Sequence, residues 1–422
     1  MKFQRPKGTE DLYQEQAVLY SNIINRLVAL AKKFNYQEII TPVIESAELF
    51  LSTIGSTTNI VEKEIYQFLD KGNRTLALRP EGTAGVIRAI VENKLYSNQK
   101  QTQKYFYCGT MYRYENPQKG RNREFHQFGV EVLGTKHPLI DGEVILLANA
   151  MLTALDIKDI TLHLNYFGSE ATKDKFNQVL LTVLRKEKNK LCGDCQLRIE
   201  KNPLRVLDCQ TCQKLDLNLP AMKQFYTPEE KQYWQELTNG LKQMKINFQV
   251  DPYLVRGLDY YNGVIFEFMS ASGVLGKSQN TLIGGGRYDN LCEQLGVPYQ
   301  YPAIGFAFGI ERLMLMLANH PDFSSSKPLD LFIASQHQAG LVEVLMLINR
   351  LRKTKYFIDG IFDVFNDKQK NRLIKNLKNS NNLLILEETG KATLYHLLKQ
   401  QKSAISYQND SELLAKITKL LI

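Results

Sequence analysis

Several short stretches of this sequence place charged and aromatic side chains beside glycines. They are LRPEGTAG (78–85), LVRGLDYYNG (254–263), GGGRYD (284–289) and GIERL (309–313). Glycine lets a backbone and a ligand approach closely, so each stretch is a candidate contributor to one charged binding surface. GGGRYD lacks the spacing of a dinucleotide fingerprint, and the sequence has no G-x-x-x-x-G-K-[ST] motif. By itself, GGGRYD is therefore only a weak indication of a nucleotide site.

A second group of polar residues follows two predicted strands, YFYCGTMYRYE (105–115) and EFHQFGVEVLG (124–134), which form a long antiparallel hairpin. Arg113 and Glu115 are two residues apart and point to the same face of the first strand. Gln127 and Glu131 share one parity on the return strand. Alternating polar residues are also typical of a half-solvated sheet, but the glycine-flanked charges favour a binding surface.

Four of the six cysteines form two C-x2-C pairs separated by thirteen residues: Cys192, Cys195, Cys209 and Cys212. Without a signal for secretion, this spacing is more typical of four thiolates around a structural zinc ion than of disulfides. Four reduced thiols in a small subdomain are the alternative interpretation.

The composition limits the class of protein. With 422 residues, 44% apolar and 23% charged, the chain is long enough for two or three domains and typical of a globular protein. Neither a secretory signal nor a run of about 18 apolar residues is present, so we expect a cytoplasmic protein without a membrane partner. The net charge is +9, and residues 328–422 carry fourteen Lys or Arg against nine Asp or Glu. This basic end indicates either nucleic-acid contact or a solvated helix face.

The helices and strands that must position these residues follow from the spacing of the apolar residues and from the Gly and Pro residues that interrupt it. Residues 21–35 have the apolar spacing of an amphipathic helix, and 302–319 reads as a strand running into a helix. The Lys- and Glu-rich segment at about 170–245 is predicted to be a helical insertion that carries the cysteines. After a linker at 324–328, strands and helices alternate as a small α/β unit over 329–422.

The motifs TLALRPEGTAGVIRA, YRYENPQKGRNREFHQFGVEVLG, LVRGLDYYNGVIFEF, GGGRYDNL and AIGFAFGIERL together resemble the histidyl-tRNA synthetases, a family of class II aminoacyl-tRNA synthetases. The resemblance extends from GTED (8–11) to about Leu317. It implies an α+β catalytic domain over 1–323, built on an antiparallel sheet with flanking helices, and an α/β anticodon-binding domain over 329–422. It also implies a homodimer whose interface involves TPVIES (41–46), with L-histidine, ATP, Mg²⁺ and tRNA(His) as ligands.

The resemblance implies a role for each pocket residue. The catalytic residues would be Arg113, at the α-phosphate and the histidine carboxylate, and Arg256, an arginine near the α-phosphate. Glu115 would contact the adenine amine, Phe125 would stack on the adenine ring, and Arg312 would hold the γ-phosphate. The residues expected to bind histidine are Glu81, Gly82, Thr83, Arg113, Gln127, Glu131, Arg256, Tyr260 and Tyr261. Among them, Glu131 and Tyr261 would contact the imidazole.

Two departures from the family pattern limit what the resemblance implies. GTEDLYQEQ lacks the usual proline, and the C-terminal stretch NLLILEETGKATLYHLLKQQ is divergent, so no anticodon contact is assigned. The main alternative function is a non-catalytic, synthetase-like regulatory subunit of ATP phosphoribosyltransferase. That paralogue usually lacks an intact LVRGLDYY and the C-terminal domain, both of which this chain has. A general nucleic-acid-binding module would explain the charge but not the clustered pocket residues.

Overall fold

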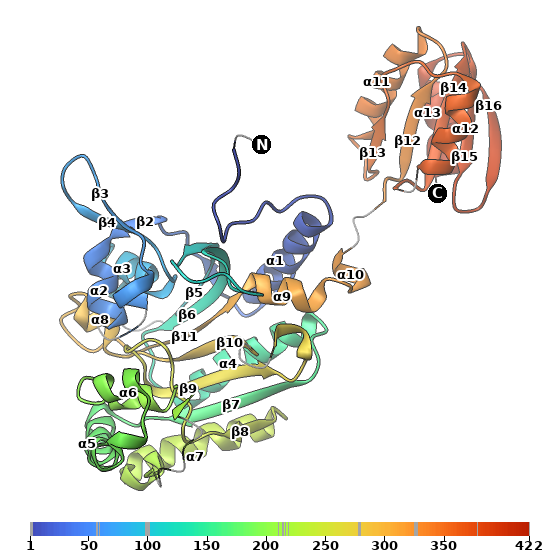
Figure 1. Cartoon of the computed structure of the whole chain (residues 1–422). Coiled ribbons are helices and arrows are strands. Elements are labelled where there is room, and N and C mark those ends of the chain that lie inside the picture. The colour runs from blue at the N-terminus through green and yellow to red at the C-terminus, as the bar shows by residue number, and fades with distance from the viewer. Residues whose placement is uncertain are drawn as a thin grey trace. The chain divides into compact units, whose positions relative to one another are not determined.

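The computed structural model divides the chain into two compact units, residues 1–324 and 325–422 (Figure 1). It describes residues 3–55, 58, 60–97, 102–209, 211–212, 215, 217, 219–276, 280–324, 328–377 and 379–421. None of the helices in these ranges is long and apolar enough to cross a membrane.

An eight-stranded sheet forms the centre of the first unit, in the order β1-β5-β6-β11-β10-β9-β7-β8. All neighbouring strands are antiparallel except the pairs β1–β5 and β7–β8 at the two edges. The strand bounds are β1 Gln37–Glu38, β5 Gln103–Tyr112, β6 Glu124–Leu133, β7 Ile160–Tyr166, β8 Phe248–Val250, β9 Asn262–Ser270, β10 Thr281–Arg287 and β11 Ala303–Gly309. The predicted hairpin is β5–β6, and β11 runs directly into α9 (Ile310–Leu317), as predicted.

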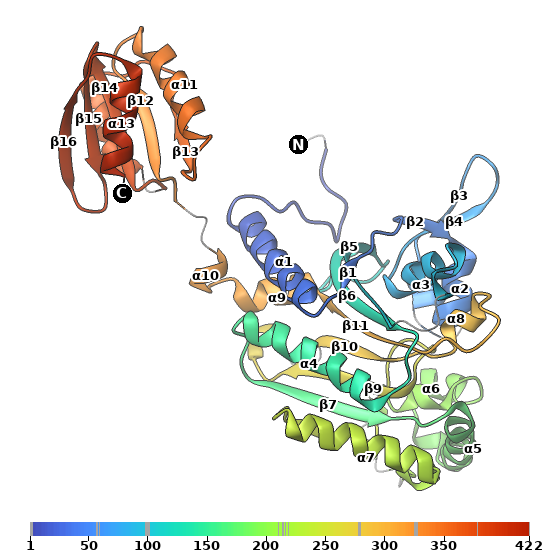
Figure 2. The ribbon, with the colours of Figure 1, turned by 180° about the vertical axis from the view of Figure 1, so that it is seen from behind.

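One face of this sheet is apolar and is covered by α1 (Glu15–Lys33) and α4 (Pro138–Ala154), as Figure 2 shows. Phe128 on β6 lies 5.7 Å from Phe106 and 5.6 Å from Phe308, measured between ring centroids. Tyr20 of α1 contacts His126, which has the same parity as Phe128. Side chains of odd parity on β6 therefore point to the opposite face, away from these helices.

A smaller three-stranded sheet, β2 (Ile44–Ser46), β4 (Thr75–Leu78) and β3 (Gln67–Leu69), lies beside the central sheet. It packs with α2 (Ala47–Ile54), and the chain then passes into α3 (Thr83–Glu92). The turn between β4 and α3 is residues 79–82, so the glycine-flanked acid Glu81 stands just before a helix.

The cysteine-bearing insertion is helical, as predicted, and runs from α5 (Glu170–Lys186) through α6 (Gly193–Arg198) to α7 (Pro228–Gln243). Glu230 joins the two long helices at their first turns. Its carboxylate accepts hydrogen bonds from the Ser169 amide at 2.6 Å, the Thr172 hydroxyl at 2.9 Å and the Thr227 amide at 2.9 Å. The Thr227 hydroxyl caps α7 in return, which completes a capping box.

The second unit contains a five-stranded sheet in the order β13-β12-β14-β15-β16, with a separate apolar core. Its strands are β12 Leu331–Ser335, β13 Ile358–Gly360, β14 Asn382–Glu388, β15 Lys391–His396 and β16 Gln401–Ser406, and its helices are α11 Gly340–Leu351, α12 Asp367–Asn376 and α13 Asp410–Leu420. The antiparallel strands β15 and β16 were not predicted. Gly390, with φ of 77°, makes the tight turn between β14 and β15. The α+β class predicted for the chain is confirmed.

Candidate active site

The face of the central sheet opposite α1 and α4 has almost no side chains of its own across its middle strands. The register aligns Glu131 with Gly305 and Gly286 in one row, and Gly129 with Ala307 and Gly284 in the next. A Cβ atom on Gly305 would overlap the carboxylate of Glu131. The space above this face is therefore available to longer side chains and to a ligand.

Glu131 is the most buried acid over this face and makes two hydrogen bonds. Its carboxylate accepts from the Thr83 hydroxyl at 2.7 Å and from the Tyr288 hydroxyl. Burial and the nearby Glu81 together raise the pKa of Glu131 to about 8, although the two hydrogen bonds act against the increase. Glu131 thus keeps its proton to a higher pH than an exposed glutamate does.

Glu81 lies in the turn before α3 and is also buried. One carboxylate oxygen accepts from the Thr83 amide and the other from the Ala84 amide, both at 2.7 Å. Burial raises the pKa of Glu81, while these amides lower it. Gly82 is needed here because a Cβ atom would overlap the ring of Tyr107, which also occupies the space over Gly129.

The tyrosines of LVRGLDYY form an aromatic wall beside Glu131. The ring centroids of Tyr260 and Tyr261 are 4.7 Å apart, and that of Tyr288 lies 5.5 Å from Tyr260. Gln127 projects from the same face of β6. Its side-chain oxygen is buried and has no hydrogen-bond partner among the described residues. A buried amide oxygen without a partner can accept a hydrogen bond from a ligand.

Arg256 forms an ion pair with Glu267 of β9. The nearby Asp259 binds Arg205 at 2.7 Å. The Glu267 carboxylate also accepts a hydrogen bond from Thr281 at 2.8 Å. The Nε atom of Arg256 is buried without a partner among the described residues, so part of this guanidinium can still bind a ligand.

Four arginines gather around the other end of the face: Arg113, Arg121, Arg256 and Arg312. Burial and the three other arginines together lower the pKa of Arg312 to about 10, while Glu115 acts against them. Arg312 keeps its charge at neutral pH, and its guanidinium donates to the Thr281 carbonyl. Arginine guanidinium groups gathered at one place can bind the phosphates of a polyphosphate.

Arg113 and Phe125 are neighbours at this end. The Arg113 guanidinium carbon lies 5.2 Å from the centroid of the Phe125 ring, and its Nε donates to the Pro80 carbonyl at 2.9 Å. Glu115 lies 3.1 Å from Arg121 and 4.0 Å from Arg113. The structure thus brings the sequence-predicted residues of both groups onto one face of the sheet.

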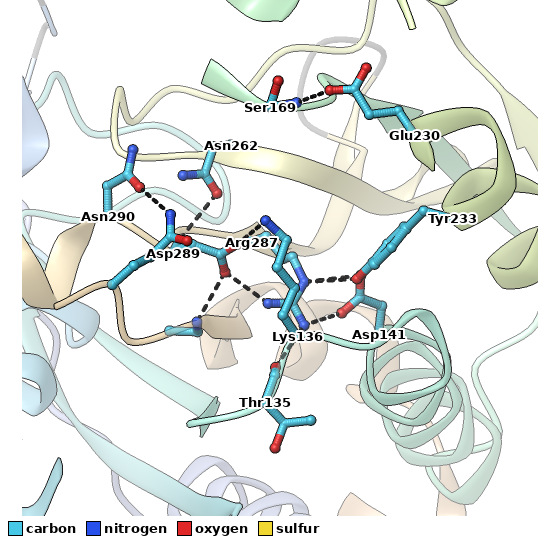
Figure 3. A network of polar contacts seen from close by, with 12 residues as sticks. Thr135, Lys136, Asp141, Ser169, Glu230, Tyr233, Asn262, Arg287, Asp289 and Asn290 are labelled. Atoms are coloured by element: carbon cyan, nitrogen blue, oxygen red, sulfur yellow. Dashed lines mark hydrogen bonds and ion pairs between the residues drawn. The ribbon is translucent and has the colours of Figure 1, made fainter. Parts of the chain in front are cut away.

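The arginine of GGGRYD does not belong to this surface, which corrects the expectation that every glycine-flanked charge serves one site. Arg287 follows Gly286 and alternates to the opposite face, where it pairs with Ile304 of β11. Figure 3 shows its buried guanidinium between Asp141 of α4, at 2.7 Å, and Asp289, at 2.8 Å. Lys136 completes the network at 3.1 Å from Asp289.

A cavity of about 460 Å³ opens beside this network. Its lining includes Lys136, Ser169, Glu229, Asn262 and Asn290, and none of the predicted site residues. The Arg287 network is therefore structural: it ties the end of β10 to α4 and to the Tyr233 hydroxyl of α7.

The four predicted zinc ligands are brought together. Their sulfur atoms all lie within 4.8 Å of one another, and those of Cys192 and Cys209 are 3.7 Å apart. Two sulfurs on a tetrahedral zinc ion, with Zn–S bonds of about 2.3 Å, lie about 3.8 Å apart. None of the six cysteines forms a disulfide. The geometry therefore fits a four-thiolate zinc site.

Four residues that the sequence analysis did not identify complete the site: Tyr107, Tyr288, Glu267 and Arg205. Glu267 carried a signal, because a lone carboxylate in the otherwise apolar strand VIFEF must have a buried partner. The sequence indicated Tyr107 more weakly, because Tyr107 pairs with Gly129 across the predicted hairpin. Arg205 carried no such signal, since its partners are more than fifty residues away along the chain.

Comparison with known proteins matches this chain to one family. The family model described as histidyl-tRNA synthetase matches residues 8–313. The histidine–tRNA ligase of Anoxybacillus flavithermus is 42% identical over 356 residues, 84% of each chain, and that of Lacticaseibacillus casei is 39% identical over 396 residues, 93% of this chain and 91% of its own. The crystal structure of apo histidyl-tRNA synthetase from S. aureus superposes with a TM-score of 0.81 at 31% identity, covering 98% of this chain and 99% of that one.

Proposed function

This chain belongs to the histidyl-tRNA synthetase family and acts as a histidine–tRNA ligase, and on that premise we propose how its site divides the work. The histidine carboxylate attacks the α-phosphorus of ATP, and the bond to the β-phosphate oxygen breaks. Histidyl-adenylate and pyrophosphate result. The acyl group then passes to the 3′ ribose of tRNA(His), which releases AMP.

The Glu131 end of the face binds the amino acid. Glu131 and Tyr261 contact the imidazole, while Glu81, Thr83 and Gln127 receive the α-amino group, with Tyr260 and Gly82 closing the pocket. The unpartnered oxygen of Gln127 is the observation that best supports this orientation, because an ammonium group would supply its missing donor. A pocket of buried polar groups rejects an amino acid that cannot satisfy them by a factor of about 10⁴ or more.

The arginine end binds ATP. Arg113 and Arg256 hold the α-phosphate, Arg312 the γ-phosphate, Phe125 stacks on adenine, and Glu115 accepts from the adenine amine. Mg²⁺ bound to the outer phosphates would offset their charge. Attack brings two anions together, so fixed positive charge at the α-phosphate lowers the barrier. The clustering of Arg113, Arg121 and Arg256 around Arg312 supports this assignment.

A structural zinc ion bound by Cys192, Cys195, Cys209 and Cys212 fits the cysteine cluster. Hydrogen bonds from the Cys212 and Thr211 amides and from neighbouring thiols outweigh the effect of burial and lower the pKa of Cys209 to about 7. Four thiolates leave no open position on a tetrahedral ion, so the zinc would stabilise the fold without entering the reaction.

The second unit, 329–422, binds the anticodon region of tRNA(His), and the enzyme is a cytoplasmic homodimer. The net positive charge of the second unit supports the first assignment. Exposed apolar side chains at and beside TPVIES support the second: Ile40 is 84% exposed and Ile44 is 49% exposed. Contiguous apolar residues on a surface are typical of a contact with another chain.

The test is histidine-dependent ATP–pyrophosphate exchange. We expect exchange with L-histidine alone among the amino acids. Gln127→Leu should raise the KM for histidine by about 10-fold or more, since a buried ammonium would lose a hydrogen bond. Gln300→Leu removes an exposed Gln–Asn hydrogen bond and should have no effect. Histidine binding without exchange would instead support the regulatory-subunit alternative, which the family's ligases and the intact Arg256 segment disfavour.

A further inference from the structure

The segment between the two cysteine pairs, 196–208, contacts the loop that carries Arg256. Arg205 donates from one guanidinium nitrogen to the Arg256 carbonyl at 3.0 Å and from the other to the Asp259 carboxylate at 2.7 Å. Asn202 donates to the same carboxylate oxygen at 3.0 Å. Two side chains of the insertion thus hold the backbone of the LVRGLDYY loop at two points.

The Arg256 loop is otherwise held by a few contacts along its length: Asn165 donates to the Leu254 carbonyl at 3.0 Å, Lys173 donates to the Tyr261 carbonyl at 3.0 Å, and Arg256 pairs with Glu267. Residues 251–261 contain neither a helix nor a strand. On the side of the loop away from the insertion, the Asp259 amide donates to the Ile54 carbonyl at 3.0 Å, and Gly55 leaves the space that the Asp259 side chain fills. Arg205 is itself mostly buried, with a side chain 9% exposed, so water does not readily replace its hydrogen bonds.

The bracing segment has little regular structure of its own. It comprises the end of the six-residue helix α6 and a single 3₁₀ turn, Pro203–Val206. Such short helices are not stable alone, because the free energy needed to nucleate a helix exceeds the stabilisation that a single turn provides. The four sulfurs stand at its two ends, so one ion bound to them would close the loop and limit the positions available to Asn202 and Arg205.

We propose that the zinc site of the insertion is a brace for catalysis: metal bound by the four cysteines fixes Asn202 and Arg205, which position the Arg256 guanidinium for adenylate formation. Asn202 and Arg205 are positioning residues, since they touch the backbone and side chain of the loop. This inference rests on the proposed role of Arg256 and assigns the insertion a part in the chemical step.

Arg205→Ala tests the brace directly. We expect the single-turnover rate of adenylate formation to fall about 10- to 100-fold, the scale expected when a catalytic group is misplaced by about 1 Å. The dissociation constant of histidine should change less than about three-fold, because Arg205 touches none of the residues at the Glu131 end. Arg205→Lys should recover only part of the rate, since one ammonium cannot reproduce the two-pronged contact. Arg185→Ala, which removes an exposed ion pair with Glu200 in the same insertion, is the matched control and should leave the rate unchanged.

A double-mutant comparison separates this brace from the role of Arg256 itself. If Arg205 acts through Arg256, then Arg205→Ala should have no further effect on the rate in an Arg256→Ala background. An equal loss in both backgrounds would overturn the brace. If Arg256→Ala alone left the rate unchanged, the proposed role of Arg256 would fail, whereas a slow Arg256→Ala beside a normal Arg205→Ala would overturn only the brace.

Hydrogen exchange tests the metal without relying on activity. Removing zinc from the purified full-length enzyme with a chelator should free four thiols and speed amide exchange in peptides covering 196–208 and 254–261. Exchange in 331–335, a strand of the second unit, should stay the same. Faster exchange in 196–208 with no change in 254–261 would overturn the coupling, and protein purified without chelator that contained no zinc would overturn the metal.

Discussion

Glu131 should make the enzyme less stable as the pH rises, and Glu131→Gln should weaken that trend. The folded protein raises the pKa of this carboxyl from 4.5 to about 8, first by burial and then by the nearby Glu81, against hydrogen bonds from Tyr288 and Thr83. Between these two values the folded state keeps a proton that the unfolded state releases. The free energy of unfolding must therefore fall as the pH rises through this interval.

The size of the effect follows from the two pKa values. Each pH unit inside the interval costs about 1.4 kcal/mol, so from pH 5 to pH 7 the wild type should lose about 2.6 kcal/mol relative to the glutamine variant. Burial leaves only 1% of Glu131 exposed, so solvent screening does not reduce this figure. The glutamine variant also loses or changes hydrogen bonds. This changes its free energy of unfolding by the same amount at every pH, so the slope of that free energy against pH is unaffected.

The assay is urea unfolding at pH 5, 6 and 7, at fixed protein concentration, followed by tryptophan fluorescence. Trp234 is the single tryptophan and stacks on Tyr166 in the first unit, so it reports the unit that contains Glu131. Glu229→Gln is the control. The pKa of Glu229 is lowered by its own α7 backbone and by Thr227, so its contribution changes only below pH 4.5 and its slope should match the wild type. Parallel slopes for wild type and Glu131→Gln would refute the assignment of a retained proton to Glu131.

Three further predictions concern the chemistry and the parts that support it. Arg256→Ala should slow adenylate formation by about 10² or more, with a smaller change in histidine binding; a lower melting temperature with an unchanged rate in the folded fraction would show that Arg256 only holds the loop. Elemental analysis of protein purified without chelator should find about one zinc per chain, and Cys209→Ser should lower that content; full zinc occupancy without Cys209 would contradict the four-thiolate site. Removing residues 325–422 should impair aminoacylation of tRNA(His) far more than pyrophosphate exchange, and an equal loss of both in a folded, dimeric truncation would count against an anticodon role.

Strand periodicity made much of the catalytic face predictable from the sequence. Residues 125, 127 and 131 lie at odd positions of one strand of the hairpin. Because side chains alternate between the two faces of a strand, these three share a face once the strand is recognised. The same period places Arg287, one residue after Gly286, on the opposite face with Ile304, so the glycine-flanked motif and not the strand period led to the wrong expectation. The Arg256–Glu267 ion pair could have been predicted, since both residues lie in the segment LVRGLDYYNGVIFEF.

Contacts between distant segments were not predictable. Arg205 meets Asp259 only because the insertion folds back over the site, and no local pattern encodes that return. In the second unit, the strands β15 and β16 lie in a sequence rich in lysine and glutamine. Apolar and polar residues alternate only weakly there, so the pattern did not predict these strands. Assignment of site residues to roles came from the family resemblance, and those roles stay predictions until the variants are measured.

The glycines in the middle of the sheet affect how selectivity can change. The side chains of Tyr107, Arg256 and Glu131 fill the space over Gly129, Gly284 and Gly305, so a side chain added at any of these glycines would displace a residue of the site. The neighbouring strands hold these glycines in register, so the sheet itself cannot shift to make room. Inhibitors for this enzyme would have to grow outward, toward the tyrosines and the arginines, and mutations that relax its amino-acid preference should arise in those walls.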